Sequence, residues 1–502
     1  MDQQQLSLSY GGNEYTEDYF YNSPADYYDL YDDAIDGQNQ DEQSFWSHLS
    51  FYQLCTQCVL PAIWSTCNLL GTTLILCIFF RLFVVVGNKI RSIPKAVFHI
   101  VCTICGVLPI ILFYEDGDLF QLLLQIVIFP MFCYTLSIIC LLTLKQYTSI
   151  IFSTVILLTL LYRECFSDDT KWRKTKSCHM LMSLKAMAVL FDLRSNELHK
   201  FPPVYQYTGY MLCAGTIYLG PFLTFQEYKN ALFTPVYWNT SKVFNVIRKI
   251  IISLFCFVMS ICLLDWLLNK HMYIDENRNT ITNIFLLMYK QALEFRTGHY
   301  FISYMSTVFA MVCGYNTEIL VTLPMAIEWP QSLLNVVIYW NVPMHHWLKK
   351  YIFEEVLKYG KKNKHTNKIL AVGATYLVSS LLHGLEVRLS AVLLSLALYT
   401  YVEHRLRTKL ASKFLKTYSY YSKNYHNSKK YISTNNCTWF IWIINLIFTI
   451  LNIIHLAYLG SVMDVSVVNS VRSYYDSFEP WRRVSYFSHF IILFMYLISI
   501  IL

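Results

Sequence analysis

Charged residues are scarce in this chain of 502 residues. Asp, Glu, Lys and Arg make up only 15% of it, whereas 55% of the residues are hydrophobic. A soluble domain is usually about half apolar and about a quarter charged, so this composition excludes an ordinary soluble protein. The formal net charge of +7 does not indicate nucleic-acid binding, because the basic residues lie mostly in short loops between apolar runs.

Basic residues are absent from the N-terminal part of the chain. Residues 1–50 contain eleven Asp and Glu but no Lys or Arg, and the first basic residue is Arg81. The segment therefore lacks the basic region with which a signal peptide begins. Because so acidic a segment cannot bury enough apolar surface to fold alone, we expect residues 1–55 to form a disordered tail and residues 56–502 to form the membrane domain.

A complete metal-binding motif is also absent. Among the 15 cysteines, Cys55 and Cys58 have the spacing of half a zinc or redox site, and so do Cys102 and Cys105. Neither pair has a second half with suitable ligands nearby. We therefore predict no metal site and interpret both pairs as small hydrophobic residues.

Long apolar runs account for much of the sequence. A run of about 20 apolar residues can cross a bilayer as a helix. The sequence thus predicts an all-α, polytopic membrane protein with about 9–11 transmembrane helices plus re-entrant or interfacial helices. The apolar runs are residues 68–87, 96–114, 119–144, 249–268, 440–460 and 490–502.

The basic residues predict how the chain is oriented. None precedes the first span, whereas Lys89, Arg91 and Lys95 follow it. The positive-inside rule therefore places this loop in the cytosol and the N-terminal tail in the lumen. By the same rule, the basic loops 349–368 and 403–430 are cytosolic.

Two segments depart from the pattern of an ordinary span. Residues 167–196 are too polar for one and predict an interfacial or re-entrant helix. Lys185 in this helix would either bind an anionic head group or phosphate, or extend to the membrane surface. Residues 205–228 are interrupted by Gly and Pro, and irregular backbone at membrane depth is tolerated only where it is buried or lines a cavity. We expect this second segment to form a wall of a reaction chamber.

One histidine, His383, lies deep inside an apolar segment. No charged residue occurs between Ile369 and Leu382, and a helix through them would carry His383 roughly 20 Å from the cytosolic face. An ionisable side chain at that depth is usually retained for a role, although a core histidine satisfied by a backbone carbonyl is the alternative. Asn341 lies in a similarly apolar stretch, and the two together favour an acyl-transfer pair.

The chemistry of this pair is simple. Histidine can take a proton from an alcohol as its oxygen attacks a thioester. An Asn amide can orient the histidine or donate to the developing oxyanion. Such a pair also occurs in transporters, but a transporter predicts an internal repeat and the sequence shows none.

A second group of polar residues begins at position 296. Arg296, His299, Tyr300 and Ser303 recur at helical spacing, so they share one face of a predicted helix. Such a stripe either lines a cavity or marks a membrane boundary, and both interpretations stay open.

Local motifs carry a family resemblance. Residues 340–344 include Trp340 and Asn341, residues 379–384 include His383, and residues 401–404 follow. Together with the stripe at 296–303, they resemble the membrane-bound O-acyltransferase family, in particular its members that acylate Wnt proteins. The resemblance covers about residues 172–464, which would form the catalytic core.

The resemblance also implies a reaction and a site. His383 would be the catalytic histidine and Asn341 its partner. Palmitoleate would pass from a cytosolic fatty acyl-CoA to a serine of a Wnt protein in the lumen of the endoplasmic reticulum. No cofactor is implied besides this co-substrate. The residues expected to contact the substrates are Trp340, Ser379, Leu382, Arg296, His299, Tyr300, Ser303 and Lys185.

Some positions depart from the family pattern. Lys176 and Ser177 stand where the family has Arg-Gly, and Glu386 and Arg388 stand where small or neutral residues are more usual. These departures bear on donor affinity and chain-length choice. Other acceptors for the same chemistry, such as another secreted protein or a lipid alcohol, stay open. So do a transporter, a receptor, and a protein that binds Wnt without acylating it.

Overall fold

The computed structural model describes residues 49–502, apart from residues 91–92, 113–118, 145–146, 168, 235–237, 273–279, 316–318, 360–363, 385, 415–437 and 464–477. Every regular element in this described part is a helix, which confirms the predicted all-α class. Most of the predicted acidic tail and most of the basic loop 403–430 lie outside the described residues.

The first helix of the described residues begins inside the range assigned to the tail. Ser50 accepts the N–H of Gln53 while the Gln53 side chain accepts from Ser50, and this capping box starts the helix at Phe51. The elements as far as residue 194 are α3 (Phe51–Leu54), the π-helical turn η1 (Cys55–Val59), α4 (Leu60–Lys89), α5 (Lys95–Leu112), α6 (Leu119–Thr143), α7 (Thr148–Phe166) and α8 (Asp169–Arg194).

The predicted irregular segment 205–228 contains two short helices with a buried turn region between them. They are α9 (Val204–Met211) and α10 (Phe225–Phe233), and the intervening residues 212–218 are all buried. The next elements are α11 (Thr240–Val258), the π-helical turn η2 (Met259–Leu263), α12 (Leu264–Met272) and α13 (Ile281–Val312).

The remaining helices are shorter on average. Those before residue 415 are α14 (Pro324–Glu328), α15 (Leu333–Trp340), α16 (Val342–Leu348), the π-helical turn η3 (Lys349–Phe353), α17 (Glu354–Tyr359), α18 (Lys364–Leu382) and α19 (Val387–Phe414). The last are α20 (Thr438–Gly460), the 3-10 turn η4 (Ser461–Met463), α21 (Glu479–Arg483) and α22 (Phe487–Ile501).

Several helices are long and apolar enough to cross a membrane. The described residues contain six of them, and two shorter apolar helices end at Leu382 and Ile501. Helices α8, α13 and α19 are also long enough at about 1.5 Å per residue, but they are more polar. The multi-pass prediction is therefore confirmed. The six are Phe51–Lys89, Lys95–Leu112, Gln125–Thr143, Thr148–Phe166, Thr240–Leu268 and Trp442–Met463.

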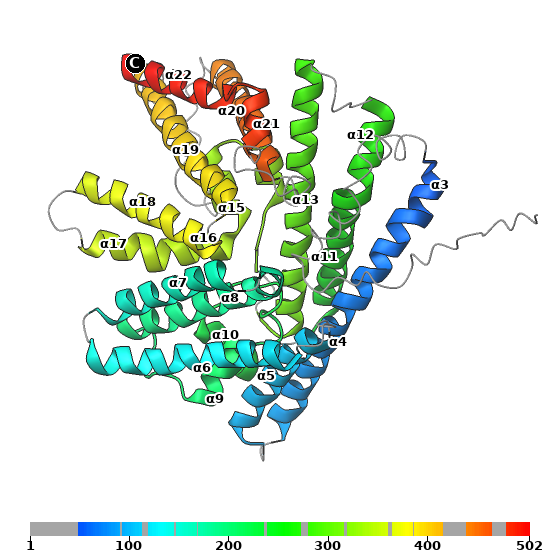
Figure 1. Ribbon diagram of the computed structural model, residues 1–502, viewed down its shortest axis with the longest axis vertical. Coiled ribbons are helices and arrows are strands. Elements are labelled where there is room, and N and C mark those ends of the chain that lie inside the picture. Colours follow the sequence, from blue (N-terminus) through cyan, green and yellow to red (C-terminus); the bar gives the residue numbers. More distant parts are fainter. Residues whose placement is uncertain are drawn as a thin grey trace, which may run out of the picture.

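Helix α13 stands near the centre of the molecule (Figure 1). It packs against α11 on one side and α20 on the other, and also against α4. Helices α6, α7 and α8 pack together and run crosswise to α13, and α18 contacts α7. A large apolar core joins these helices, and a smaller one lies mainly among α19, α20 and α22.

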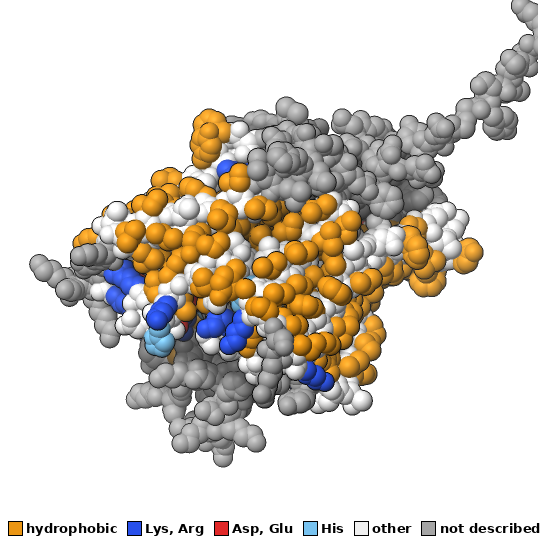
Figure 2. All heavy atoms as spheres, turned by 90° about the horizontal axis from the view of Figure 1, so that it is seen from below, with side chains coloured by type: hydrophobic (Ala, Val, Ile, Leu, Met, Phe, Trp, Pro, Cys, Tyr) orange, Lys and Arg blue, Asp and Glu red, His pale blue; other side chains and the backbone are white. Residues whose placement is uncertain are grey.

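Large hydrophobic side chains also cover the surface. On α4, Trp64 is 70% exposed, Ile75 is 65% exposed and Phe79 is 56% exposed. Figure 2 shows hydrophobic side chains spread over the face seen from below, with Lys and Arg gathered toward its lower edge. An apolar surface this extensive is suited to lipid contact.

Helix α8 corrects the prediction for residues 167–196. It is one continuous helix, and every residue from 181 to 192 is buried against its neighbours, chiefly α6 and α7. A helix that is buried on all sides over this stretch does not lie on the membrane surface, so the interfacial alternative is wrong, and the re-entrant alternative stays a prediction. Its polar residues suggested a membrane surface, but they find partners inside the protein instead.

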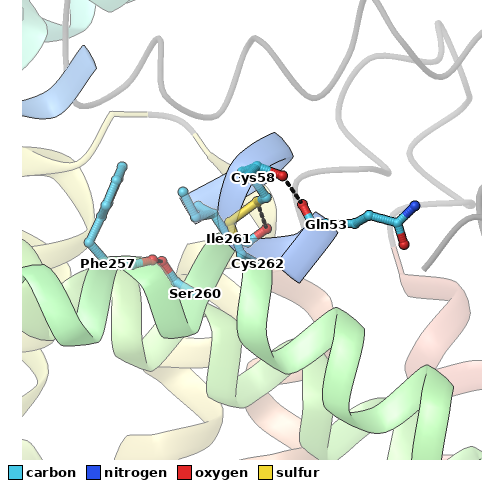
Figure 3. The surroundings of a disulfide bond; sticks show 7 residues. Gln53, Cys58, Phe257, Ser260, Ile261 and Cys262 are labelled. Carbon is cyan, nitrogen blue, oxygen red and sulfur yellow. Dashed lines mark hydrogen bonds between the residues drawn. A yellow bond between two sulfur atoms is a disulfide. The ribbon is translucent and has the colours of Figure 1, made fainter. Parts of the chain in front are cut away.

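The cysteines correct a second prediction. Cys58 in η1 and Cys262 in η2 form a disulfide, with their Cα atoms 6.1 Å apart (Figure 3). The interpretation of Cys58 as a small hydrophobic residue is therefore wrong. The sequence did not indicate the bond, because the two cysteines lie 204 residues apart in the chain. Disulfides form in oxidising compartments. This bond agrees with the lumenal position that the charge pattern predicts for the start of α4.

Candidate active site

His383 lies in the turn that ends α18. The helix stops at Leu382, one residue short of the predicted position, and the N–H of His383 donates to the carbonyl of Ser380 at 3.2 Å. Gly384 has a φ of +88°, in the left-handed region that favours glycine at helix ends. The turn leaves His383 half-buried at the end of an apolar helix.

Asn341 separates α15 from α16. It is the N-cap of α16, and its Oδ1 accepts the N–H of Met344 at 3.1 Å. Asn is favoured at this position, and Pro343 in the first turn has no N–H that needs a partner. Because Oδ1 caps the helix, Asn341 would use its Nδ2 donors to contact a substrate.

The fold places these two residues at the same end of a helical hairpin. Helices α16, η3 and α17 follow one another from Val342 to Tyr359, and α18 returns along η3 and α17 (Figure 1). The two arms are nearly equal in length. Asn341 precedes the first arm and His383 follows the second, so both residues belong to the end of the hairpin that lies opposite the connection between α17 and α18.

The stripe on α13 reaches the same segment. His299 donates from Nε2 to the carbonyl of Trp340 at 2.8 Å, and the two rings stack with centroids 4.3 Å apart. Ser303 Oγ lies 3.4 Å from the same nitrogen. Three predicted site residues, His299, Ser303 and Trp340, are thus in contact, and Trp340 is the residue that precedes Asn341 in the chain.

Arg296 and Tyr300 face a different partner. Arg296 forms a bidentate ion pair with Glu328 of α14 at 2.8 and 3.0 Å, and the Tyr300 hydroxyl donates to Glu328 at 2.6 Å. Sequence reasoning missed Glu328, because a single Glu at the end of a five-residue helix gives no signal of its own. Its partners on α13 were recognised from their helical spacing.

The sequence profile of MBOAT, the membrane-bound O-acyltransferase family, matches residues 108–459. That range includes the whole hairpin and both of its terminal polar residues. The chain belongs to the membrane-bound O-acyltransferase family. It is accordingly a membrane acyltransferase.

Similar proteins in this family carry two kinds of name. A Mus musculus protein named protein-serine O-palmitoleoyltransferase porcupine is 30% identical over 383 residues, which are 72% of this chain and 78% of that protein. One of the same name from Anopheles gambiae is 33% identical, covering 48% and 51% of the two chains. Lysophospholipid acyltransferase 1 of Arabidopsis thaliana is 23% identical, covering 42% and 50%.

In this acyltransferase, Lys185 lies elsewhere than predicted. It is 1% exposed, and its Nζ donates to the carbonyls of Tyr210 and Met211 at 2.8 and 3.2 Å and to Thr216 at 2.7 Å. These bonds use all three of its donors at the C-terminal end of α9, where a cation is favoured. It neither reaches the membrane surface nor has a donor left for a head group.

The remaining predicted residues lie in the last turn of α18. Ser379 is half-buried and Leu382 is buried in the large core. Their neighbour Ser380 bonds to Ser390 of α19 at 2.6 Å, which ties the two helices beside His383. Whether these residues contact a substrate stays a prediction. Within the described residues, no group of three or more His, Cys, Asp or Glu is arranged to hold a metal ion.

Proposed function

We propose that this acyltransferase transfers a palmitoleoyl group from acyl-CoA to a serine hydroxyl of a Wnt protein in the membrane of the endoplasmic reticulum. The observation that carries the proposal is the similarity to proteins named protein-serine O-palmitoleoyltransferase, which extends over 72% of the chain. The motifs at residues 340–344 and 379–384 support the choice of a Wnt acceptor.

His383 would act as general base and then as general acid. It takes the serine proton as the serine oxygen bonds to the thioester carbonyl carbon. The carbon–sulfur bond then breaks, and His383 gives the proton to the leaving thiolate of CoA. Proton transfer of this kind contributes about 10²–10⁴-fold to a rate.

Asn341 would stabilise the intermediate. While Oδ1 caps α16, the Nδ2 group can donate to the oxyanion that develops on the former thioester carbonyl. Removing one such donor typically costs about 10²–10³-fold in turnover. The reaction as written needs no resident cofactor or metal, and acyl-CoA is its co-substrate.

The direction of α18 supports delivery of the two substrates from opposite sides. The helix starts at Lys364 in the basic loop 349–368 and extends 19 residues, or about 28 Å, before reaching His383. A donor from the cytosol and an acceptor from the lumen would therefore meet near the far end of this helix. The disulfide between Cys58 and Cys262 supports a lumenal position for the N-terminal end of the first span, opposite the basic loop that follows α4.

A second candidate acceptor is a lysophospholipid. The similarity to lysophospholipid acyltransferase 1 favours it, although that similarity is lower in identity and in coverage. The chemistry at His383 would be the same, because a glycerol hydroxyl replaces the serine hydroxyl.

The decisive assay follows a labelled palmitoleoyl group from its CoA thioester to a Wnt-derived serine peptide. Purified protein is compared with its His383→Ala variant, and the peptide with a Ser→Ala peptide. Transfer that needs both His383 and the serine supports the proposal. Transfer to lysophospholipid alone would support the second candidate, and no transfer to either would contradict both.

A further inference from the structure

An ion pair lies directly against the turn that carries His383. Lys176 of α8 contacts Glu164 of α7, with Nζ 2.7 Å from Oε1. A Cβ atom added to Gly384 would lie 2.6 Å from that carboxylate oxygen and 2.7 Å from that ammonium nitrogen. The two charged groups therefore rest on the backbone of the residue that follows His383.

The carboxylate is held in place from two directions. Lys176 binds Oε1 of Glu164, and the indole Nε1 of Trp172 donates to Oε2 at 2.5 Å. The Trp172 ring lies under the guanidinium of Arg163, with 4.9 Å between Arg163 Cζ and the ring centroid. Arg163 in turn bonds to His179 at 2.9 Å. This network spans the facing ends of α7 and α8, so the surface it offers to Gly384 is rigid.

Leu382, which is buried in the large core, and the bond between Ser380 and Ser390 hold the last turn of α18 before His383. Gly384 has no side chain, and its backbone rests against the ion pair. Gly384 fits the site for two reasons, its positive φ and its contact with the ion pair. A shift of the ion pair would therefore move the backbone next to His383.

We infer that Lys176 and Glu164 form a positioning pair for His383, which sets the place of the imidazole relative to the reacting atoms. The inference rests on the proposed function and deepens it. A displacement of about 1 Å at a catalytic group can cost about 10²-fold in rate. If one partner is removed, the other keeps an unpaired charge in a half-buried place, and the pair no longer holds its geometry.

The test measures turnover with saturating acyl-CoA and the KM for acyl-CoA separately. Lys176→Met and Glu164→Gln should each lower kcat about tenfold or more with KM within about twofold. The double variant should be no slower than the slower single variant, because both changes remove one interaction. Lys176→Arg, which keeps the positive charge, should retain most of the turnover. An unchanged kcat, or a rise in KM alone, would overturn the inference, since the latter would make Lys176 a donor-binding residue.

A matched control is the ion pair between Lys290 of α13 and Asp265 of α12, whose side chains are also partly buried. Lys290→Met removes the contacts of Lys290 with Asp265 and with Glu294 of α13, which lie away from the turn, and should change kcat less than about twofold. A drop in Lys290→Met equal to that in Lys176→Met would overturn the inference, because any lost ion pair would then have the same effect.

A readout that needs no turnover separates this inference from the proposed function. The rate at which diethylpyrocarbonate modifies His383 is followed by mass spectrometry in both lysine variants and in the unchanged protein. We expect a change of about threefold or more in Lys176→Met, and none in Lys290→Met. Failure of all transfer by the unchanged protein would contradict the proposed function. Equal modification rates in all three proteins would overturn the positioning role whatever the transfer assay gives.

Discussion

At the scale of single residues, the candidate site combines His383, which is proposed to react, with Asn341, which also caps a helix. His383 follows the end of α18 and is half-buried. Asn341 caps α16 through Oδ1. The sequence pointed to both residues, because a polar side chain in an apolar stretch is conspicuous. It did not show that Asn341 has a structural task, since a helix N-cap depends on a boundary that apolar periodicity leaves open.

Replacing His383 by Ala should abolish transfer. The general base is lost, which corresponds to about 10²-fold or more in turnover, while a half-buried side chain at a helix end contributes little to stability. The assay is palmitoleoyl transfer, with the amount of monodisperse protein measured in parallel. A comparable loss of folded protein would contradict the catalytic assignment.

Two substitutions separate the roles of Asn341. Aspartate can still accept the Met344 N–H but cannot donate, so Asn341→Asp should keep the stability and lose about 10²-fold in turnover. Alanine loses both functions, and Asn341→Ala should also cost about 1 kcal/mol in the free energy of unfolding. Turnover and thermal unfolding are measured on both variants. Full turnover in Asn341→Asp would remove the oxyanion role.

At the scale of elements, two ion pairs hold the segment that leads to Asn341, and the second of them is buried. Arg296 of α13 holds Glu328 of α14. Glu403 of α19 accepts the N–H of Leu333 at the start of α15 at 2.8 Å, and Arg407 binds both Glu403 and the carbonyl of Gln331. The segment is therefore held first by α13 and then, at the start of α15, by α19.

Breaking the second of these pairs should destabilise the protein. Arg407→Met leaves a buried carboxylate on Glu403, which is 2% exposed, and such a loss costs about 3–5 kcal/mol. Thermal unfolding in detergent measures the effect. Arg483→Met is the control, because its partner Glu479 is exposed and surface pairs contribute about 0–1 kcal/mol. Equal melting temperatures for the two variants would contradict a structural role for Arg407.

At the scale of the whole molecule, hydropathy and charge were enough for the all-α, multi-pass architecture, because the bilayer restricts what an apolar run can do. The burial of α8 was missed for a related reason. Its polar residues look like surface residues until their partners are known, and the partners of Lys185 are backbone carbonyls. Glu164 and Glu328 were missed because each is defined by its contacts with another helix, α8 for Glu164 and α13 for Glu328.

The disulfide is the longest-range of these contacts, and it allows a test of orientation and stability together. It closes a loop of 204 residues between η1 and η2, and disulfides of this kind contribute about 2–4 kcal/mol. Cys58→Ser and Cys262→Ser should lower the melting temperature equally, and the double variant should match them, because either change removes the same bond. In the unchanged protein, a maleimide should modify Cys58 and Cys262 only after denaturation with a reductant, while the exposed Cys165 should react without one. Labelling of Cys58 without reduction would contradict the bond, and the lumenal placement of the start of α4 would lose its support from the disulfide.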